Sequence, residues 1–471
     1  MFIDRENELR HLNEEYAKSG ARFVVIYGRR RTGKTALIEE FLKDNADAIY
    51  YMADQQVEQQ QIEDFKKQVL AYKRDEFLEK TRFTDWDQFF SYFVKLIPTD
   101  KRVLLVIDEV TYIIKNRPAF PSILQKYWDK HLSKSGVFLI LSGSLVGLML
   151  KKVLGYNAPL YGRRTSQIHL TPFDFRTSSR FMKEKSIEER IRMYAMTGGV
   201  AKYLLLASEE KSAAGLIKNN FLEKEGFFYQ EGLFLLLQEF KNPTVYMSIL
   251  KAISMGKNKL KEMADFTGID GKKISMYLDV LQTIGIVAKI VPVTEDEKKF
   301  RGAFYRINDN FLKFWFRFIF PNKSKVEIRD TELLHKEIQS SLNTYIGPVF
   351  EEIVREFLAE LNKGAELPFS FKRIGTWWGA YRDDANERKT AEIDIVALND
   401  QTKEILFCEC KWQENVDASA ILMKLKEKTK YVEWNNGKRK EHYAIFAKSF
   451  KKRFKEPNLL LFDLTDLEKL L

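Results

Sequence analysis

The sequence predicts an α/β protein of several domains. Its 471 residues exceed what one hydrophobic core normally serves, so roughly two to four domains are expected. The apolar run Phe23–Tyr27 precedes a glycine-rich stretch and a helical pattern, and the apolar run Val103–Ile107 precedes two carboxylates. Such runs are typical of strands buried on both faces of a parallel sheet. The N-terminal part is therefore predicted to be a parallel sheet covered by helices.

The glycine-rich stretch is the most specific motif of the chain. Gly28–Thr35, G-R-R-R-T-G-K-T, fits the P-loop pattern in every fixed position, and residues 36–42 continue as a helix. The glycines let backbone N–H groups curl around phosphate oxygens, and the helix N-terminus adds positive potential. Lys34 is expected to reach the β- and γ-phosphates and Thr35 to hold Mg²⁺. We therefore expect ATP with Mg²⁺, contacted by Gly28, Arg29, Arg30, Arg31, Thr32, Gly33, Lys34, Thr35 and Ala36.

Two further polar groups follow apolar strands. Asp108 and Glu109 lie where open α/β sheets place their ligands, at the carboxyl end of a strand. We expect Asp108 in the Mg²⁺ shell, through water, and Glu109 to orient and polarise the attacking water. The strand over residues 136–141 ends in Ser142 and Ser144, whose hydroxyls are expected to sense the γ-phosphate. A hydroxyl at this place has the sensor role in NTPases with an extra strand between the P-loop strand and the Asp-Glu strand. The alternative is an ordinary strand-end turn.

These motifs together resemble a known family. Phe2–Leu9 (F-I-D-R-E-N-E-L), the P-loop, the Asp-Glu pair and the Ser-Gly-Ser turn, with Pro159–Thr165 and Thr197–Tyr203, are similar to the archaeal-type ATPases, STAND NTPases related to AAA+ proteins. The resemblance implies an ATPase with a helical lid over residues 1–225. Ala201 stands where the family usually has proline, which leaves nucleotide sensing by the lid open.

Two arginines in the resembling segment are candidates for a role in hydrolysis. Arg163 directly follows Gly162 and is expected to contact the γ-phosphate, in cis or from a neighbouring protomer, with Arg164 as the second candidate. The alternative is a surface turn or a salt bridge to the lid.

The middle of the chain, residues 226–310, predicts a winged helix. Three short helices, at 243–255, 259–267 and 272–284, precede strands at 286–293 and 304–307. The third helix would present its outward residues to DNA: Lys272, Lys273 and Ser275. The alternative is a domain that packs against the ATPase as a switch.

An aromatic helical connector, residues 311–340, leads to the last domain, residues 341–471. This domain predicts a helix at 347–361, strands at 368–375, 390–398 and 404–411, a helix at 417–434 and a strand at 442–447. The order αβββαβ, with Asp394 and Glu409-Cys410-Lys411, resembles the PD-(D/E)xK core, a restriction-endonuclease-like α/β fold. It also resembles the uncharacterised domain that accompanies archaeal-type ATPases.

Strand alternation gives these residues a chemical reading. Glu409 and Lys411 project to one face of their strand, and Cys408 and Cys410 project to the other. Asp394 and Glu409 are expected to hold a second Mg²⁺ or Mn²⁺, with Glu351 completing the site. Lys411 would orient the attacking water or neutralise the developing charge.

The charge of the chain is uneven. Its net charge is +11, and residues 424–455 hold twelve Lys or Arg against three Glu. This suggests a polyanion partner, DNA or RNA, and the alternative is a solvated lysine-rich face. No run of 18 apolar residues and no secretory signal is present, and the two cysteines form no disulfide framework, so no membrane association and a cytoplasmic location are expected.

The sequence thus predicts an ATP-binding and hydrolysing switch that controls a C-terminal metal-dependent, nuclease-like, DNA-binding domain. The alternative is a non-cleaving regulator, in which this domain only binds nucleic acid or a protein partner. A chaperone-like ATPase is a third reading, and a homo-oligomer is compatible with each.

Overall fold

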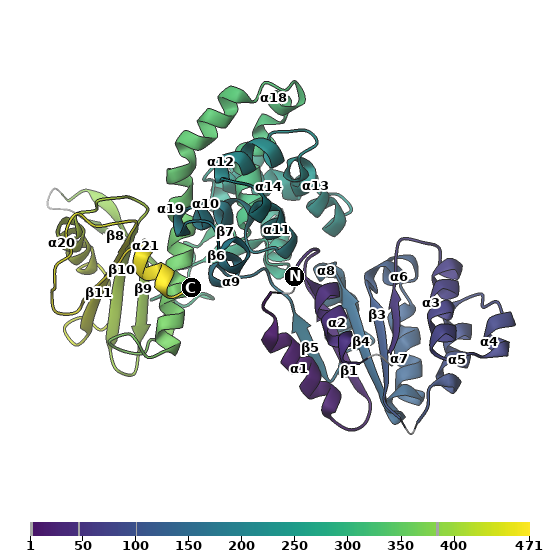
Figure 1. Ribbon diagram of the computed structural model, residues 1–471. Helices are drawn as coiled ribbons and strands as arrows, with labels where there is room; N and C mark the ends of the chain where they lie inside the picture. The colour runs from purple at the N-terminus through teal and green to yellow at the C-terminus, as the bar shows by residue number, and fades with distance from the viewer. Residues whose placement is uncertain (1–2, 46–47, 100, 383–385) are drawn as a thin grey trace. The chain divides into compact units, whose positions relative to one another are not determined.

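The computed structural model describes residues 3–45, 48–99, 101–382 and 386–471 (Figure 1). Phe2, the first residue of the N-terminal motif, lies outside these ranges. The chain divides into two units: Met1–Pro172 with Val200–Lys202, and Phe173–Gly199 with Tyr203–Leu471.

The first unit is built on a five-stranded parallel sheet, as predicted. The strand order is β2-β3-β4-β1-β5. The bounds are β1 (Arg22–Tyr27), β2 (Ala48–Met52), β3 (Val103–Asp108), β4 (Val137–Gly143) and β5 (Ser166–His169). β4 lies between β1 and β3, which confirms the predicted extra strand. The carboxyl ends of β1, β4 and β3 therefore meet at one edge.

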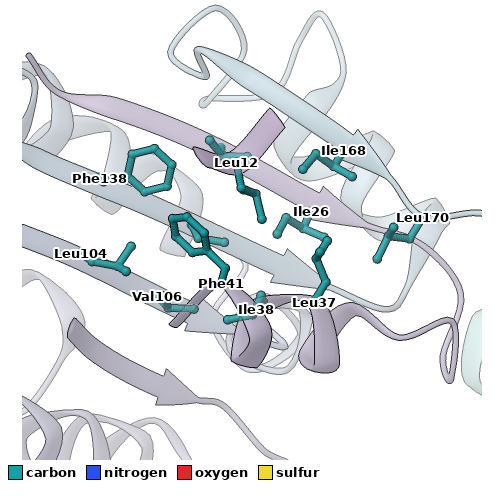
Figure 2. Packing of buried hydrophobic residues seen from close by; sticks show 12 residues of the cluster. Leu12, Ile26, Leu37, Ile38, Phe41, Leu104, Val106, Phe138, Ile168 and Leu170 are labelled. Carbon is teal, nitrogen blue, oxygen red and sulfur yellow. The ribbon is translucent and has the colours of Figure 1, made fainter. Parts of the chain in front are cut away.

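Helices cover both faces of this sheet. On one face, Leu12 of α1 (Glu6–Ala17) and the apolar residues of α2 (Lys34–Lys43) pack against the strands, as Figure 2 shows. On the other face, Trp128 of α7 (Phe120–Lys130) contacts Phe23. On the same face, Phe65 of α3 (Glu58–Tyr72) stacks on Tyr51. The remaining helices are α4 (Glu76–Lys80), α5 (Trp86–Leu96), α6 (Thr111–Asn116) and α8 (Val146–Met149).

The second unit begins with helices and a hairpin. The helices are α9 (Phe175–Ser179), α10 (Ile187–Thr197), α11 (Ala201–Glu209), α12 (Ala213–Leu216), α13 (Phe227–Glu239), α14 (Thr244–Ser254), α15 (Leu260–Thr267) and α16 (Gly271–Thr283). The first two residues of α11 belong to the first unit. The hairpin is β6 (Val287–Ile290) and β7 (Phe304–Ile307). The predicted order of three helices and two strands is present, while the winged-helix assignment stays a prediction. β6 ends before Pro292 because proline has no N–H, and the N–H of Val293 donates to Thr376 O instead.

A long helix follows the aromatic segment. α17 (Asn310–Phe314) continues into a π-helical turn, Trp315–Ile319, and α18 (Lys323–Glu327) precedes α19 (Glu332–Lys363). The sequence predicts this last helix only from residue 347, where glycine and proline follow one another. Pro348 instead lies inside α19, whose buried apolar residues extend from Leu334 to Leu361. Burial of this apolar face outweighs the backbone hydrogen bond that proline removes.

The C-terminal sheet is mixed. Its order is β12-β11-β10-β9-β8, with β8 and β10 antiparallel to β9 and with β11 and β12 parallel to β10. The bounds are β8 (Arg373–Arg382), β9 (Arg388–Asn399), β10 (Glu404–Lys411), β11 (Lys440–Ala447) and β12 (Leu459–Phe462), with α20 (Ala418–Thr429) and α21 (Leu464–Lys469). β8 begins later than predicted because Asn362 exchanges two hydrogen bonds with the backbone of Phe371 and holds that segment outside the sheet.

None of the described helices combines the length and apolar character that crossing a lipid bilayer requires.

Candidate functional site

The P-loop joins β1 to α2 and depends on two glycines. A Cβ on Gly28 would lie 2.2 Å from Leu170 O, and Gly33 has φ +94°, a left-handed value that favours glycine. The buried Lys34 Nζ donates to Gly28 O at 3.0 Å and to Arg29 O at 2.9 Å. The lysine ammonium therefore lies inside the loop, where a phosphate would meet it.

Thr35 and Asp108 meet at the adjoining strand ends. Thr35 Oγ1 donates to Asp108 Oδ2 at 2.9 Å, and Tyr50 OH donates to the same oxygen at 3.1 Å. Burial, and then the charge of Asp108, raises the pKa of Tyr50, so the phenol stays a donor. A threonine hydroxyl beside a carboxylate is an oxygen donor set of the kind that Mg²⁺ takes. These residues fit the predicted Mg²⁺ site.

Glu109 is held by the turn after β4. Its φ is +53°, and its Oε2 accepts from Ser144 Oγ at 2.6 Å and from Ser144 N–H at 3.3 Å. Ser142 O accepts from Val110 N–H at 2.8 Å. Among the described residues, the buried Ser142 Oγ has no hydrogen-bond partner. Of the two predicted sensor hydroxyls, only that of Ser144 therefore contacts the candidate catalytic carboxylate.

The arginines of the P-loop make separate contacts. Arg30 Nη2 donates to Tyr112 OH at 2.6 Å, and Arg31 O accepts from Lys202 N–H at 3.5 Å. Arg29 O accepts from Thr32 Oγ1 at 2.8 Å as well as from Lys34. Ala201 is the first residue of α11, a position where proline is well tolerated. The structure thus brings the predicted P-loop residues together with Asp108, Glu109 and Ser144 at one edge of the sheet.

Arg163 lies at the opposite edge of the sheet. It precedes β5, whose first residue, Ser166, pairs with Val24 near the start of β1, whereas the P-loop follows the end of β1. The guanidinium forms an ion pair with Asp129 at 3.1 Å. The predicted contact with the γ-phosphate in cis is therefore wrong for this arrangement, because the strand separates the two ends. A contact from a neighbouring protomer stays a prediction.

In the C-terminal domain, a β-bulge places Asp394. Gly375 pairs with Val396 but Trp377 pairs with Ile393, so β9 contributes one extra residue at this point. Asp394 Oδ2 accepts from Cys410 N–H at 2.8 Å and lies 3.4 Å from Lys411 Nζ. Burial, and then the charge of Glu409, raises the pKa of Asp394.

Glu409 is enclosed by two ammonium groups. Its Oε2 lies 2.5 Å from Lys411 Nζ and its Oε1 lies 2.6 Å from Lys428 Nζ of α20, and the residue is 3% exposed. Burial opposes charge on Lys411, but the charges of Asp394 and Glu409 raise its pKa overall. The predicted set Asp394, Glu409 and Lys411 is thus brought together. Lys428 was missed because the lysine-rich stretch offers no signal that distinguishes one lysine from the next.

Glu351 belongs to a different face. Cys410 is next to Glu409 on β10 and, because side chains alternate along a strand, points away from α20. Burial and the neighbouring Cys408, and then the charges of Asp394 and Glu351, raise the pKa of the Cys410 thiol. Glu351 therefore lies on the Cys410 side of β10. Glu351 lines a cavity of about 530 Å³ with Glu392, Asp394 and residues of β7 and α17, and neither Glu409 nor Lys411 lines it.

The predicted metal ligands Glu351, Asp394 and Glu409 therefore do not converge. In the part of the chain that the structure describes, no three His, Cys, Asp or Glu side chains are placed to hold a metal ion. Both oxygens of Glu409 accept from lysines, so a divalent cation at this carboxylate would share it with the ammonium groups of Lys411 and Lys428.

The predicted nucleic-acid residues lie on α16. Lys272 and Lys273 are exposed, and their backbone N–H groups donate to Asp270, which caps the helix. Ser275 is half-buried. Met276, 68% exposed, lies among these residues, so the outward face of α16 is partly apolar.

The basic C-terminal stretch is largely neutralised within the chain. Seven of its cationic residues form ion pairs with carboxylates: Lys426, Lys428, Lys430, Arg439, Lys440, Lys448 and Arg453. The local charge excess therefore overstates the free positive surface.

Two family matches cover the two ends of the chain. Residues 2–207 match the family described as an ATPase domain predominantly from Archaea. Residues 315–426 match the family described as archaeal and bacterial proteins of unknown function. Both correspond to the predicted resemblance, while the PD-(D/E)xK assignment stays a prediction.

Individual proteins agree with these matches. A protein of Methanocaldococcus jannaschii is 36% identical over 475 residues, covering 99% of this chain and 100% of the relative. An ATP-binding protein of Pyrococcus abyssi is 26% identical over 252 residues, 45% of this chain and 74% of the relative. The structure of a Walker-type ATPase of Pyrococcus abyssi is similar in fold, with a TM-score of 0.51, 19% identity, and coverage of 67% of this chain and 96% of that one. The chain therefore belongs to the same family as this Methanocaldococcus jannaschii protein, a family in which an archaeal-type ATPase domain is joined to a C-terminal domain of unknown function.

Proposed function

We propose that this protein binds and hydrolyses ATP and uses the nucleotide as a switch on its C-terminal domain. The observation that carries the proposal is the hydrogen bond of 2.9 Å between Thr35 and Asp108, beside Lys34 inside the loop. A P-loop lysine, a hydroxyl and a strand-end carboxylate at one edge are the parts that bind a triphosphate with Mg²⁺.

Each residue has a distinct role in this proposal. The loop N–H groups and Lys34 bind the phosphates, Thr35 and Asp108 hold Mg²⁺, and Glu109 accepts a proton from the attacking water. Mg²⁺, when bound, supplies charge neutralisation on the β- and γ-phosphates. Ser144 orients Glu109, and Arg163 acts only if a neighbouring protomer supplies it.

A hydrogen bond, a short stretch of chain and two ion pairs lie between the loop and the C-terminal domain. Lys202 N–H donates to Arg31 O, and the preceding segment leads back through two glycines to α10. Along α10, Glu188 lies 2.7 Å from Lys448 Nζ, and Arg190 lies 2.5 Å from Glu468. A change at the P-loop would therefore reach residues that contact the C-terminal domain.

Two candidate functions exist for that domain. The grouping of Asp394, Glu409 and Lys411 supports a nuclease-like domain acting on DNA or RNA, with Lys272, Lys273 and Ser275 as additional contacts and a second Mg²⁺ or Mn²⁺ as cofactor. The enclosure of Glu409 by Lys411 and Lys428 favours a non-cleaving regulator, since both of its oxygens are already paired with ammonium groups that would compete with a cation.

One experiment tests both levels. Wild type, Lys34→Ala and Asp394→Ala are assayed for ATP hydrolysis and for cleavage of plasmid and single-stranded DNA, with Mg²⁺ or Mn²⁺ and with or without ATP. Controls are Lys43→Ala, an exposed lysine of α2, and Asp400→Ala, an exposed carboxylate of the same C-terminal domain. Hydrolysis lost only in Lys34→Ala supports the ATPase, and cleavage that also changes in Lys34→Ala supports the switch. Cleavage lost only in Asp394→Ala supports the nuclease, and hydrolysis without cleavage supports the regulator.

A further inference from the structure

Arg5 has an unusual backbone and a buried charge. Asp4 and Arg5 are consecutive non-glycine residues with left-handed φ values of +58° and +76°. Such a conformation costs free energy for each residue and persists only where surrounding contacts hold it. The Arg5 side chain is 9% exposed, so its guanidinium must be satisfied by the protein.

The guanidinium connects three separate segments. Nη2 donates to Thr171 O at 2.6 Å and to Thr32 O at 3.4 Å, and Nη1 donates to Glu8 Oε1 at 3.1 Å. Thr32 belongs to the P-loop, and Thr171 is next to the end of the first unit's main segment. One side chain therefore contacts the start of α1, the P-loop and the segment after β5, where the chain leaves the first unit.

The contact with Thr32 O, long for a hydrogen bond at 3.4 Å, favours one orientation of a peptide group. In a trans peptide the C=O of one residue and the N–H of the next point in opposite directions. Holding Thr32 C=O toward Arg5 therefore directs the N–H of Gly33 away from Arg5. The N–H groups of a P-loop are the groups that cradle phosphate oxygens.

Leu170, the residue before Thr171, supports the start of the P-loop. Leu170 N–H donates to Tyr27 O at 2.8 Å, and the backbone of Leu170 lies against Gly28. Thr171, which accepts the shortest Arg5 contact, is the next residue. The segment 170–171 thus supports Gly28 directly and Thr32 through Arg5.

We propose that Arg5 is a positioning residue of the nucleotide site, which holds the P-loop in its binding conformation before ATP arrives. The effect on ATP affinity rests on the proposed function; the effect on the loop does not.

The test compares Arg5 with Arg22, a half-buried arginine of the first unit. Arg22 forms an ion pair with Glu15 at 2.5 Å, and neither residue contacts the P-loop. Arg5→Ala, Arg5→Lys and Arg22→Ala in the full chain are measured by amide hydrogen exchange of residues 28–35 without nucleotide, by ATP titration and by thermal unfolding.

Arg5→Ala is expected to raise loop exchange and weaken ATP binding by about tenfold, the equivalent of one hydrogen bond to a charged group. Arg5→Lys should recover part of both effects, because an ammonium satisfies one carbonyl but has no fork. Arg22→Ala should lower the unfolding temperature with loop exchange and affinity unchanged.

Wild-type loop exchange in Arg5→Ala would overturn the proposal, as would equal loop effects in Arg22→Ala. Faster loop exchange in Arg5→Ala, with no ATP binding by wild type, would confirm the positioning role and reject the nucleotide function instead.

Discussion

Ser144 donates both its hydroxyl and its backbone N–H to the same oxygen of Glu109. The two residues follow neighbouring strands, β4 and β3, whose pairing sets their separation. Glu109 has a left-handed φ of +53°, so its side-chain direction depends on this contact and on Asp108 Oδ1, which accepts the Glu109 N–H at 2.9 Å. The turn after β4 therefore determines where the candidate catalytic carboxylate points.

Replacing Ser144 should impair hydrolysis more than binding. In Ser144→Ala, Glu109 loses its hydroxyl donor at 2.6 Å and its preferred direction. We expect kcat for ATP hydrolysis to fall by about tenfold or more, with KM changed by less than about threefold, since misplaced catalytic groups affect the transition state most. Steady-state kinetics measure both. Ser133→Ala is the control, because this serine is exposed and its hydroxyl donates to Asp129 O; an equal loss of kcat there would contradict the assignment.

Gly28 should tolerate no side chain. A Cβ there would lie 2.2 Å from Leu170 O, a backbone atom that cannot move without shifting the end of β5. Gly28→Ala should therefore destabilise the first unit by about 2–4 kcal/mol, as overpacking of a rigid site does.

Gly20→Ala is the matched control for this clash. Gly20 has φ +74° but nothing within 4 Å of an added Cβ, so its cost is limited to roughly 1–2 kcal/mol of backbone strain. Scanning calorimetry compares the two variants. Equal unfolding temperatures for Gly28→Ala and Gly20→Ala would show that backbone strain, rather than the clash with Leu170 O, determines the loss of stability.

The sequence predicted the parts of the fold that depend on local pattern. β3 and β10 were predicted almost to the residue, because continuous apolar runs end at charged groups. The P-loop was identified from residue types at fixed spacing, and its neighbours Asp108 and Glu109 from their place after a strand.

The rest depends on contacts between distant segments. The bulge that places Asp394 arises from the register between β8 and β9, which no local pattern encodes. The sequence places Glu351 with Glu409 because its helix precedes the strands, yet α19 and α20 cover different faces of β10. Arg163 was judged from its place after a glycine, whereas the direction of β5 decides which edge it occupies.

The hairpin segment contacts Trp378 of the C-terminal sheet through Phe304 and, with ring centroids 6.1 Å apart, through Phe300. Phe304 of β7 stacks on Trp378 of β8, with ring centroids 4.5 Å apart and planes at 28°. Phe304→Ala should increase amide exchange along β8 and lower stability by about 1–3 kcal/mol, through lost burial and stacking. Phe266→Ala, at an exposed position of α15, should change neither. Unchanged exchange in β8 would show that the Phe300–Trp378 contact and the Val293 hydrogen bond to Thr376 suffice.

Glu351 should make stability depend on pH. Burial, and then the charges of Asp394 and Glu392, raises its pKa to about 8, which the charge of Arg355 only partly offsets. The unfolded chain releases this proton near its ordinary pKa of about 4.3. Between these two values the folded state binds more protons than the unfolded state, so the contribution of Glu351 to stability falls as pH rises and levels off above about pH 8.

Glu351→Gln removes this dependence while keeping the shape of the side chain. We expect the variant to be more stable than wild type by on the order of 1–3 kcal/mol at pH 8.5 and by much less at pH 5. The difference shrinks at low pH because Glu351 is then protonated in both the folded and the unfolded wild type. Thermal unfolding at both pH values measures the difference. Glu332→Gln, at the exposed start of the same helix, is the control. A stability difference between Glu351→Gln and wild type that is the same at pH 5 and pH 8.5 would contradict the raised pKa and would mean that Glu351 ionises normally in the folded protein.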